Sequence, residues 1–140
     1  MSTEENKAIV RRYQEAHNTN NLDALDEIVA ADIISHRFTP GLPPSLEGGK
    51  MAHVGTVAAI PDLHYAIEDL IAEGDKVVMR WTLTGTHTGA DLIGVPARGA
   101  RLNVTGISIF RIAGGKIVEH WAEPDAVALM QQLGLMPKPG

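Results

Sequence analysis

The end of the chain places an imidazole and a carboxylate close together, in the segment GKIVEHWAEPD at residues 115–125. His120 could exchange a proton near neutral pH, since a free imidazole has a pKa of about 6.5. Asp125 could serve as a base if apolar walls raised the pKa of its carboxyl group. Each also has a structural alternative, as a hydrogen-bonded core histidine or as an aspartate that binds free amides in the first turn of a helix. The sequence therefore offers His120 and Asp125 as candidate catalytic residues for proton transfer.

Three other side chains could hold a substrate. His36, in the segment ISHRF, could donate a hydrogen bond at the entrance of a pocket or cap the preceding helix. Trp81, in VVMRWTL, would offer a polycyclic ligand a flat apolar surface, with packing in the core or in a dimer interface as the alternative. Arg80 could bind an anionic substrate group, and a salt bridge across the sheet to Glu119 or Glu68 is the alternative. His36, Trp81 and Arg80 are therefore candidate substrate-binding residues.

Composition excludes several classes of function. The net charge of −5 disfavours nucleic acid as a partner, and the absence of cysteine excludes disulfides, thiolate nucleophiles and cysteine-ligated metals. The six histidines include no pair at helical i, i+4 spacing with an adjacent glutamate, and no glycine motif follows a strand and opens a helix as in nucleotide-binding loops. We therefore expect no metal, no cofactor and no nucleic-acid partner.

The N-terminal segment MSTEENKAIVRRYQEAHN is charged and lacks the apolar centre of a signal peptide. No apolar run approaches the roughly 20 residues that span a bilayer. These features favour a cytoplasmic protein without a membrane partner.

The spacing of apolar residues changes along the chain from a helical to a strand-like period. Three helices are expected first: one begins at a capping box of Ser2 and Glu5, a second covers residues 22–29, and a third covers residues 49–60. The loop between the second and third, TPGLPPSLEGG, is rich in proline and glycine. Alternation then predicts four long strands and a last helix that begins near Pro124 and ends at Gly134; the strands cover residues 63–72, 76–87, 100–113 and 116–123.

Helices followed by an antiparallel meander predict an α+β fold, with all 140 residues in a single domain. Such a sheet bends around the three helices on one of its faces, and the bend leaves a cone-shaped cavity. Apolar residues occur on both faces of the strands, so the outer face needs a cover. The expected architecture is thus three N-terminal helices on a curved antiparallel sheet, with a short C-terminal helix and an outer sheet face that needs either a cover or a partner chain.

This order of elements resembles the nuclear transport factor 2-like superfamily. Within it, the segments GLPPSLEGG, PDLHYAIEDLIAEGDKVVMRWTLTGTHTG and GISIFRIAGGKIVEHW, with the Asp125 that follows, are similar to the SnoaL-like polyketide cyclase family. The resemblance runs from about Lys7 to Leu133 and implies the cone-shaped fold and a homodimer through the outer sheet face. The superfold hosts cyclases, isomerases, epoxide hydrolases, dehydratases and plain binders, so the chemistry depends on the site.

The pairing of the last two strands decides which residues share the cavity face. A three-residue loop with a glycine bulge would put Ser108 opposite His120 and Phe110 opposite Val118, whereas a two-residue Gly-Gly turn would put Ser108 opposite Trp121. The resemblance favours the first pairing, because it places the active groups on the face of Ser108. That face would carry Gly106, Ser108, Phe110, Val118, His120 and Ala122, and the other Ile107, Ile109, Arg111, Ile117, Glu119 and Trp121.

The resemblance also exposes a difference. Cyclases of the family carry a histidine on the strand before the R-I-x-x-G-K-I motif and an aspartate just after the E/D-H-x triplet, and the matching positions are Ser108 and Ala122. A serine alone is too weak a base, and alanine has no reactive group. The catalytic pair of the family is therefore replaced, and both an enzyme and a binding domain without turnover fit the sequence.

Two functions remain. The first is a cofactor-independent cyclase or isomerase that moves a proton on a mid-sized hydrophobic carbonyl or polyketide-like substrate, with an epoxide hydrolase or dehydratase as a variant. In it Asp125 and His120 are catalytic, and His36 or Ser108 donates to an enolate oxygen while Phe110 lines the cone. The second is a domain of the same fold that binds a hydrophobic small molecule without turning it over.

Overall fold

The structure is a computed structural model that describes residues 2–37 and 39–138. Its three N-terminal helices and one C-terminal helix confirm the predicted α+β class. The helices are α1 (Thr3–Asn18), α2 (Leu25–Ile28, preceded by a 3₁₀ turn at Leu22–Ala24), α3 (Leu46–Ala59) and α4 (Ala126–Gln132).

The first helix begins as its sequence predicts. The Ser2 hydroxyl accepts from the amide of Glu5 at 3.1 Å, and the Glu5 carboxylate accepts from the amide of Ser2 at 3.0 Å. This reciprocal capping box satisfies amides that have no partner within the helix. Ile9, Val10 and Ala16 of α1 face the core, as their spacing along an apolar stripe requires.

The sheet has five strands in the order β1-β5-β4-β3-β2. The four predicted strands are β2 (His64–Glu73), β3 (Lys76–His87), β4 (Ala100–Ala113) and β5 (Lys116–Pro124), and they pair antiparallel in sequence. The fifth, β1 (Val29–Ser35), pairs with β5 in parallel, so the sheet is mixed rather than purely antiparallel. Val29, which the sequence assigned to a helix, extends instead because it is buried and pairs with Ile117.

The last hairpin corrects both predicted pairings. It turns on Gly114 and Gly115, and Ile112 pairs with Ile117 next to the turn. Val118 is then an extra residue on β5, so that Phe110 pairs with His120 and Ser108 with Ala122. This bulge reverses the side-chain alternation, which is why Ile117 is fully buried rather than on the outer face. The predicted cavity face of Ser108, Phe110, His120 and Ala122 is nevertheless correct, because turn and bulge together restore the parity.

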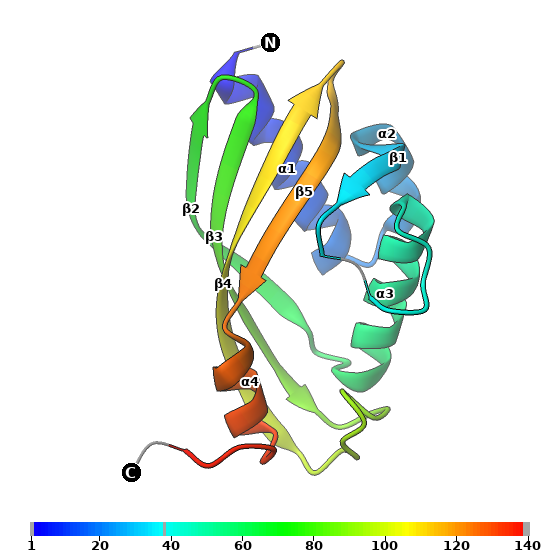
Figure 1. Cartoon of the computed structure of the whole chain (residues 1–140), viewed down its shortest axis with the longest axis vertical. Helices are drawn as coiled ribbons and strands as arrows, with labels where there is room; N and C mark the ends of the chain where they lie inside the picture. The colour runs from blue at the N-terminus through cyan, green and yellow to red at the C-terminus, as the bar shows by residue number, and fades with distance from the viewer. Residues whose placement is uncertain (1, 38, 139–140) are drawn as a thin grey trace.

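Helices and sheet form two layers with the main core between them. In Figure 1 the long strands curve across one side, α1 and α3 lie on their concave side, and α4 lies beyond the lower end of β5. The core joins α1 and α2 to β3, β4 and β5 through buried Ile9, Leu25, Val77, Phe110 and Ile117. Among the described residues, no helix is both long and apolar enough to cross a bilayer.

Candidate functional site

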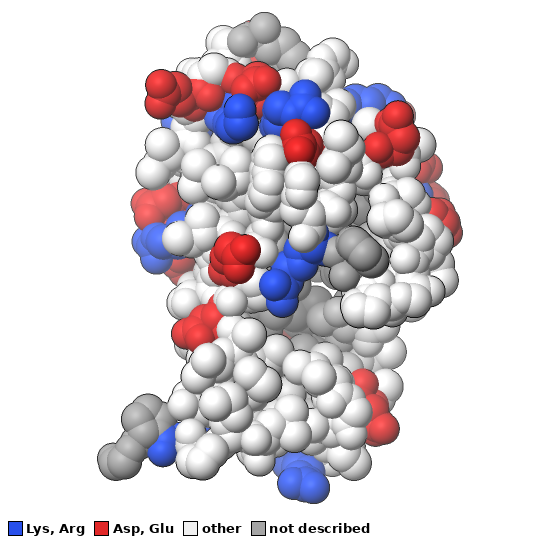
Figure 2. Space-filling view, in the orientation of Figure 1, with Lys and Arg blue, Asp and Glu red and all other residues white. Residues whose placement is uncertain are grey.

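A cavity of about 820 Å³ lies between the concave face of the sheet and helices α1 and α3. Its walls come from α1, α3, the four long strands, the segment after β1 and the loop before β4, and apolar side chains dominate them. Figure 2 shows the surface hollowed on this side, with mostly uncharged residues around the hollow. A volume of this size falls within the roughly 300–1,000 Å³ of small-molecule sites.

The described residues of the cavity wall include imidazoles but no carboxylate. Among the described residues, no aspartate or glutamate lines it, and its ionisable groups are His17, His36, His53, His120, Tyr13, Tyr65 and Arg37. The arginine is exposed at the rim. A proton that moves between a ligand and the described cavity wall must therefore be taken or given by an imidazole or a phenol.

His120 lies on the cavity wall as the sequence predicts. Its ring stacks on the ring of Phe110, its cross-strand partner, with the centroids 4.7 Å apart and the planes 10° from parallel. Burial, assisted by the nearby His17 and His36, lowers the pKa of His120 to about 4. The imidazole is therefore neutral at pH 7, and it can accept a proton at one nitrogen and donate at the other.

Trp81 and Ser108 form a buried polar pair on the same wall. The indole Nε1 donates to the Ser108 hydroxyl at 2.9 Å, and both side chains are buried. The indole lies over Gly106, where a Cβ would come within 2.2 Å of Trp81 Cζ2, so only glycine admits this placement. Because the serine oxygen accepts from the indole, its own O–H remains available to a ligand.

His36 lies at the edge of the cavity, and residues outside the cavity hold its ring in place. Its Nε2 is 2.6 Å from Glu119 Oε2, and the other carboxylate oxygen accepts from Arg111 Nε at 2.7 Å. Its ring also stacks on Trp121, with the centroids 4.8 Å apart and the planes 6° from parallel. The hydrogen bonds from His36 and Arg111 lower the pKa of Glu119. His36 is thus an oriented imidazole at the cavity entrance.

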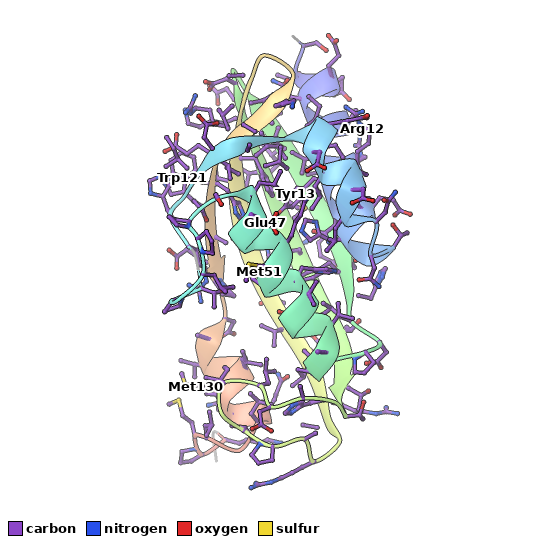
Figure 3. All side chains as sticks on the ribbon, turned by 90° about the vertical axis from the view of Figure 1, so that its right-hand side faces the viewer. Arg12, Tyr13, Glu47, Met51, Trp121 and Met130 are labelled. Atoms are coloured by element: carbon purple, nitrogen blue, oxygen red, sulfur yellow. The ribbon has the colours of Figure 1, made fainter. Side chains whose placement is uncertain are left out.

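Two histidines from the helices complete the cavity, and sequence reasoning missed both. His17 lies one turn after Tyr13 on α1; its Nδ1 is 2.8 Å from the Tyr13 carbonyl oxygen, and the two rings are 4.4 Å apart. His53 on α3 places its Nε2 2.8 Å from Asn20 Oδ1 and meets the His17 ring edge-on, with the centroids 4.9 Å apart. Figure 3 shows Tyr13 between α1 and the sheet, while Arg12 points outward. The one available signal was the i, i+4 spacing of Tyr13 and His17 on the apolar face of a helix.

Asp125 lies outside the cavity, contrary to its expected catalytic placement. It is exposed, it precedes α4, and its Oδ1 accepts from the amide of Ala128 at 3.0 Å. This geometry is that of a helix N-cap, the structural alternative recognised from the sequence.

Arg80 also lies away from the cavity. Met79 and Trp81 line it, and strand alternation puts Arg80 on the other face of β3, where Nε donates to Asp69 Oδ2 at 2.6 Å. The expected partners Glu119 and Glu68 instead contact His36 and Thr82. Arg80 therefore cannot reach a ligand in this cavity. No group of three or more metal-ligating side chains occurs within residues 2–37 and 39–138.

Comparisons with known proteins agree with this fold. The family model described as SnoaL-like polyketide cyclase matches residues 7–133. Aklanonic acid methyl ester cyclase DnrD of Streptomyces peucetius is 33% identical over 137 residues, which cover 90% of this chain and 88% of that protein. The structure of TsrD from Streptomyces laurentii superposes with a TM-score of 0.88 at 29% identity, covering 97% of this chain and 99% of that one. The structure of IdmH from Streptomyces antibioticus gives 0.80 at 31% identity, covering 92% and 98%.

Proposed function

Because this chain belongs to the SnoaL-like polyketide cyclase family, we propose that it is a cofactor-independent enzyme that closes a ring in a hydrophobic, polyketide-like carbonyl substrate. The reaction is of the aldol type: a proton leaves the carbon next to a carbonyl, that carbon attacks a second carbonyl, and the new alkoxide gains a proton. Atoms balance without an oxidant or reductant, so the protein must supply only proton transfer and orientation.

One observation carries the proposal, namely a ligand-sized apolar cavity whose wall holds the neutral imidazole of His120. The relative DnrD is named for a methyl ester substrate, and a cavity whose described walls carry no carboxylate suits an uncharged ester that contains flat rings. Trp81 and Phe110 provide flat surfaces for its rings. Ser108 offers a hydroxyl donor beside them, and His36 contacts the part of the substrate nearest the entrance.

Replacement of His120 tests the function. With an aromatic β-keto ester that carries a side-chain ketone, we expect wild-type protein to accelerate ring closure, measured by chromatography and mass spectrometry. His120→Asn should lower the rate by about 10²–10⁴-fold, the usual contribution of a positioned acid or base. Asp125→Asn, which keeps a capping side chain outside the cavity, should change it less than about twofold. Equal rates in wild type and His120→Asn would refute the assignment of His120.

A second candidate function is favoured by Ala122, which lines the cavity without a reactive group and to which the resemblance assigns the position of the family's aspartate. In this case the domain binds the same class of ligand without turning it over. Such a binder would be stabilised against thermal unfolding by the keto ester, but ring closure would proceed at the rate measured without protein.

We also propose that two copies pair through the outer face of the sheet. That face exposes Ile107 on β4 and Ile71 on β2, at 48% and 62% of their surface. Pairing would remove this apolar area from water. Gel filtration with light scattering should give twice the chain mass for wild type and the single mass for Ile107→Lys. Ile93→Lys, in the loop before β4, should remain dimeric, and a monomeric wild type would contradict the proposal.

A further inference from the structure

The hydrogen bond within α1 determines which nitrogen of His17 carries the proton. Nδ1 is 2.8 Å from the carbonyl oxygen of Tyr13, and a carbonyl oxygen can only accept. The neutral ring must therefore be protonated at Nδ1, which leaves the lone pair on Nε2. Since the bond joins residues four apart on one helix, the ring orientation is fixed by the fold before any ligand arrives.

The free nitrogen belongs to a ring on the cavity wall. His17 lines the cavity, and its Nε2 has no hydrogen-bond partner among the described residues. The ring is held on one side by Tyr13 and on another by His53, which Asn20 anchors. Within the described residues, Nε2 is thus an acceptor without a protein partner, and a hydrogen carried by a ligand can approach it.

His120 faces the same space across Tyr13. The Tyr13 ring lies 4.4 Å from the His17 ring and 6.3 Å from the His120 ring, centroid to centroid. Among the described residues no side chain or carbonyl bonds to the His120 ring nitrogens, so the N–H of the neutral ring is not taken by the protein and can be donated to a ligand. The phenol ring of Tyr13 thus lies between an acceptor, Nε2 of His17, and a donor, the N–H of His120.

We infer that His17 is the base of this site, taking the proton from the substrate carbon through Nε2 while His120 donates a hydrogen bond to the carbonyl that is attacked. The inference rests on the proposed ring closure and adds to it a division of labour between two imidazoles. It assigns the role of the family's missing aspartate to a residue on a different element, the first helix.

The proton count balances in this arrangement. The C–H bond breaks and its proton moves to His17 Nε2, giving an imidazolium and an enolate. The enolate carbon forms the new C–C bond, and the attacked carbonyl oxygen becomes an alkoxide that His120 stabilises by its N–H. The proton on His17 then passes to that alkoxide, directly or through water, which regenerates the neutral ring and releases a hydroxy ketone.

The basicity of His17 suits this role. Burial, assisted by the charge of His53, lowers its pKa to about 4, despite the hydrogen bond to Tyr13 that raises it. A pKa of about 4 is that of an ordinary carboxylate, and carboxylates of similar basicity remove protons next to carbonyl groups in other enzymes. The imidazole therefore offers the strength of an aspartate without placing a charge in the empty cavity.

Hydrogen exchange separates the two roles. The probe is a β-keto ester without a second carbonyl, which can exchange its α-hydrogen in D₂O but cannot close a ring. We expect wild type to catalyse exchange, followed by mass spectrometry. His17→Asn keeps a donor near Nδ1 and removes the lone pair, and should reduce exchange at least about 100-fold. His120→Asn should keep most of the exchange but lose ring closure, and His64→Asn, a surface control at the start of β2, should keep both.

The outcomes distinguish this inference from the function on which it rests. If ring closure needs His120 but exchange survives in His17→Asn, the function stands and the base assignment is overturned. If wild type catalyses neither exchange nor closure, both fail. A third readout needs no variant: ¹⁵N shifts of the His17 ring in wild type should show the proton on Nδ1, and a proton on Nε2 would overturn the inference.

Discussion

Acidification from pH 7 to pH 4 is expected to lower the free energy of unfolding by several kcal/mol. His17 and His120 have pKa values of about 4 in the folded chain against about 6.5 when exposed, in both cases mainly because of burial. Between these values the unfolded state binds protons that the folded state excludes, so stability falls as the pH falls. Each fully affected histidine contributes a slope of at most about 1.4 kcal/mol per pH unit. His53, whose pKa is also lowered by burial, adds to the loss in the same range.

Urea denaturation at a series of pH values measures this slope. The lowered pKa of Glu119 acts in a lower range, because a carboxylate that is stabilised in the folded state loses that contribution only below about pH 4.5. The double variant His17→Asn/His120→Asn should have a much flatter profile between pH 6.5 and 4.5. A wild-type profile that is already flat there would mean that the two rings are solvated in the folded chain.

The strands of the meander could be predicted because each depends on neighbours that are close in sequence. Alternation marks the strands, and the glycine turn between residues 113 and 116 marks the last hairpin. The start of strand β1 could not be predicted in this way, since Val29 extends only by pairing with Ile117, far along the chain. The bulge at Val118 was equally hidden, because no glycine or proline marks it.

The residues of the candidate site also differ in whether their placement depends on nearby or on distant parts of the chain. Strand parity puts Ser108 and Phe110 on one face, but the resemblance was needed to assign that face to the cavity and to bring His120 to it. For Asp125 the sequence was compatible both with a base and with a helix cap. The structure places it between the end of β5 and the start of α4, where it is the N-cap. His17 was missed because a histidine on an apolar helix face usually packs in a core. Whether a cavity remains beside it depends on how far α3 stands from the sheet.

Introduction of a carboxylate at Ala122 should raise the pKa of His120 by one to three units from its value of about 4. Ala122 lines the cavity opposite Ser108 and lies two residues from His120 on the same face of β5, so a negative charge there stabilises the imidazolium. The Ser108 O–H can donate to the new carboxylate, since the serine oxygen already accepts from Trp81. A ¹H–¹⁵N titration of Ala122→Asp measures the shift, and Ala122→Asn, of equal size and without charge, should leave it near 4.

The same substitution should restore proton abstraction where the first helix no longer provides it. His17→Asn lacks the proposed base, and Ala122→Asp supplies a carboxylate to the same cavity from β5. We therefore expect the double variant to regain α-hydrogen exchange at least about tenfold over His17→Asn alone, which is less than the roughly 10²–10⁴-fold of a well-positioned base. His17→Asn/Ala122→Asn should show no recovery. Recovery of exchange in both double variants would show that the effect comes from packing. Recovery with aspartate alone would show that the site needs a base and accepts one from either wall.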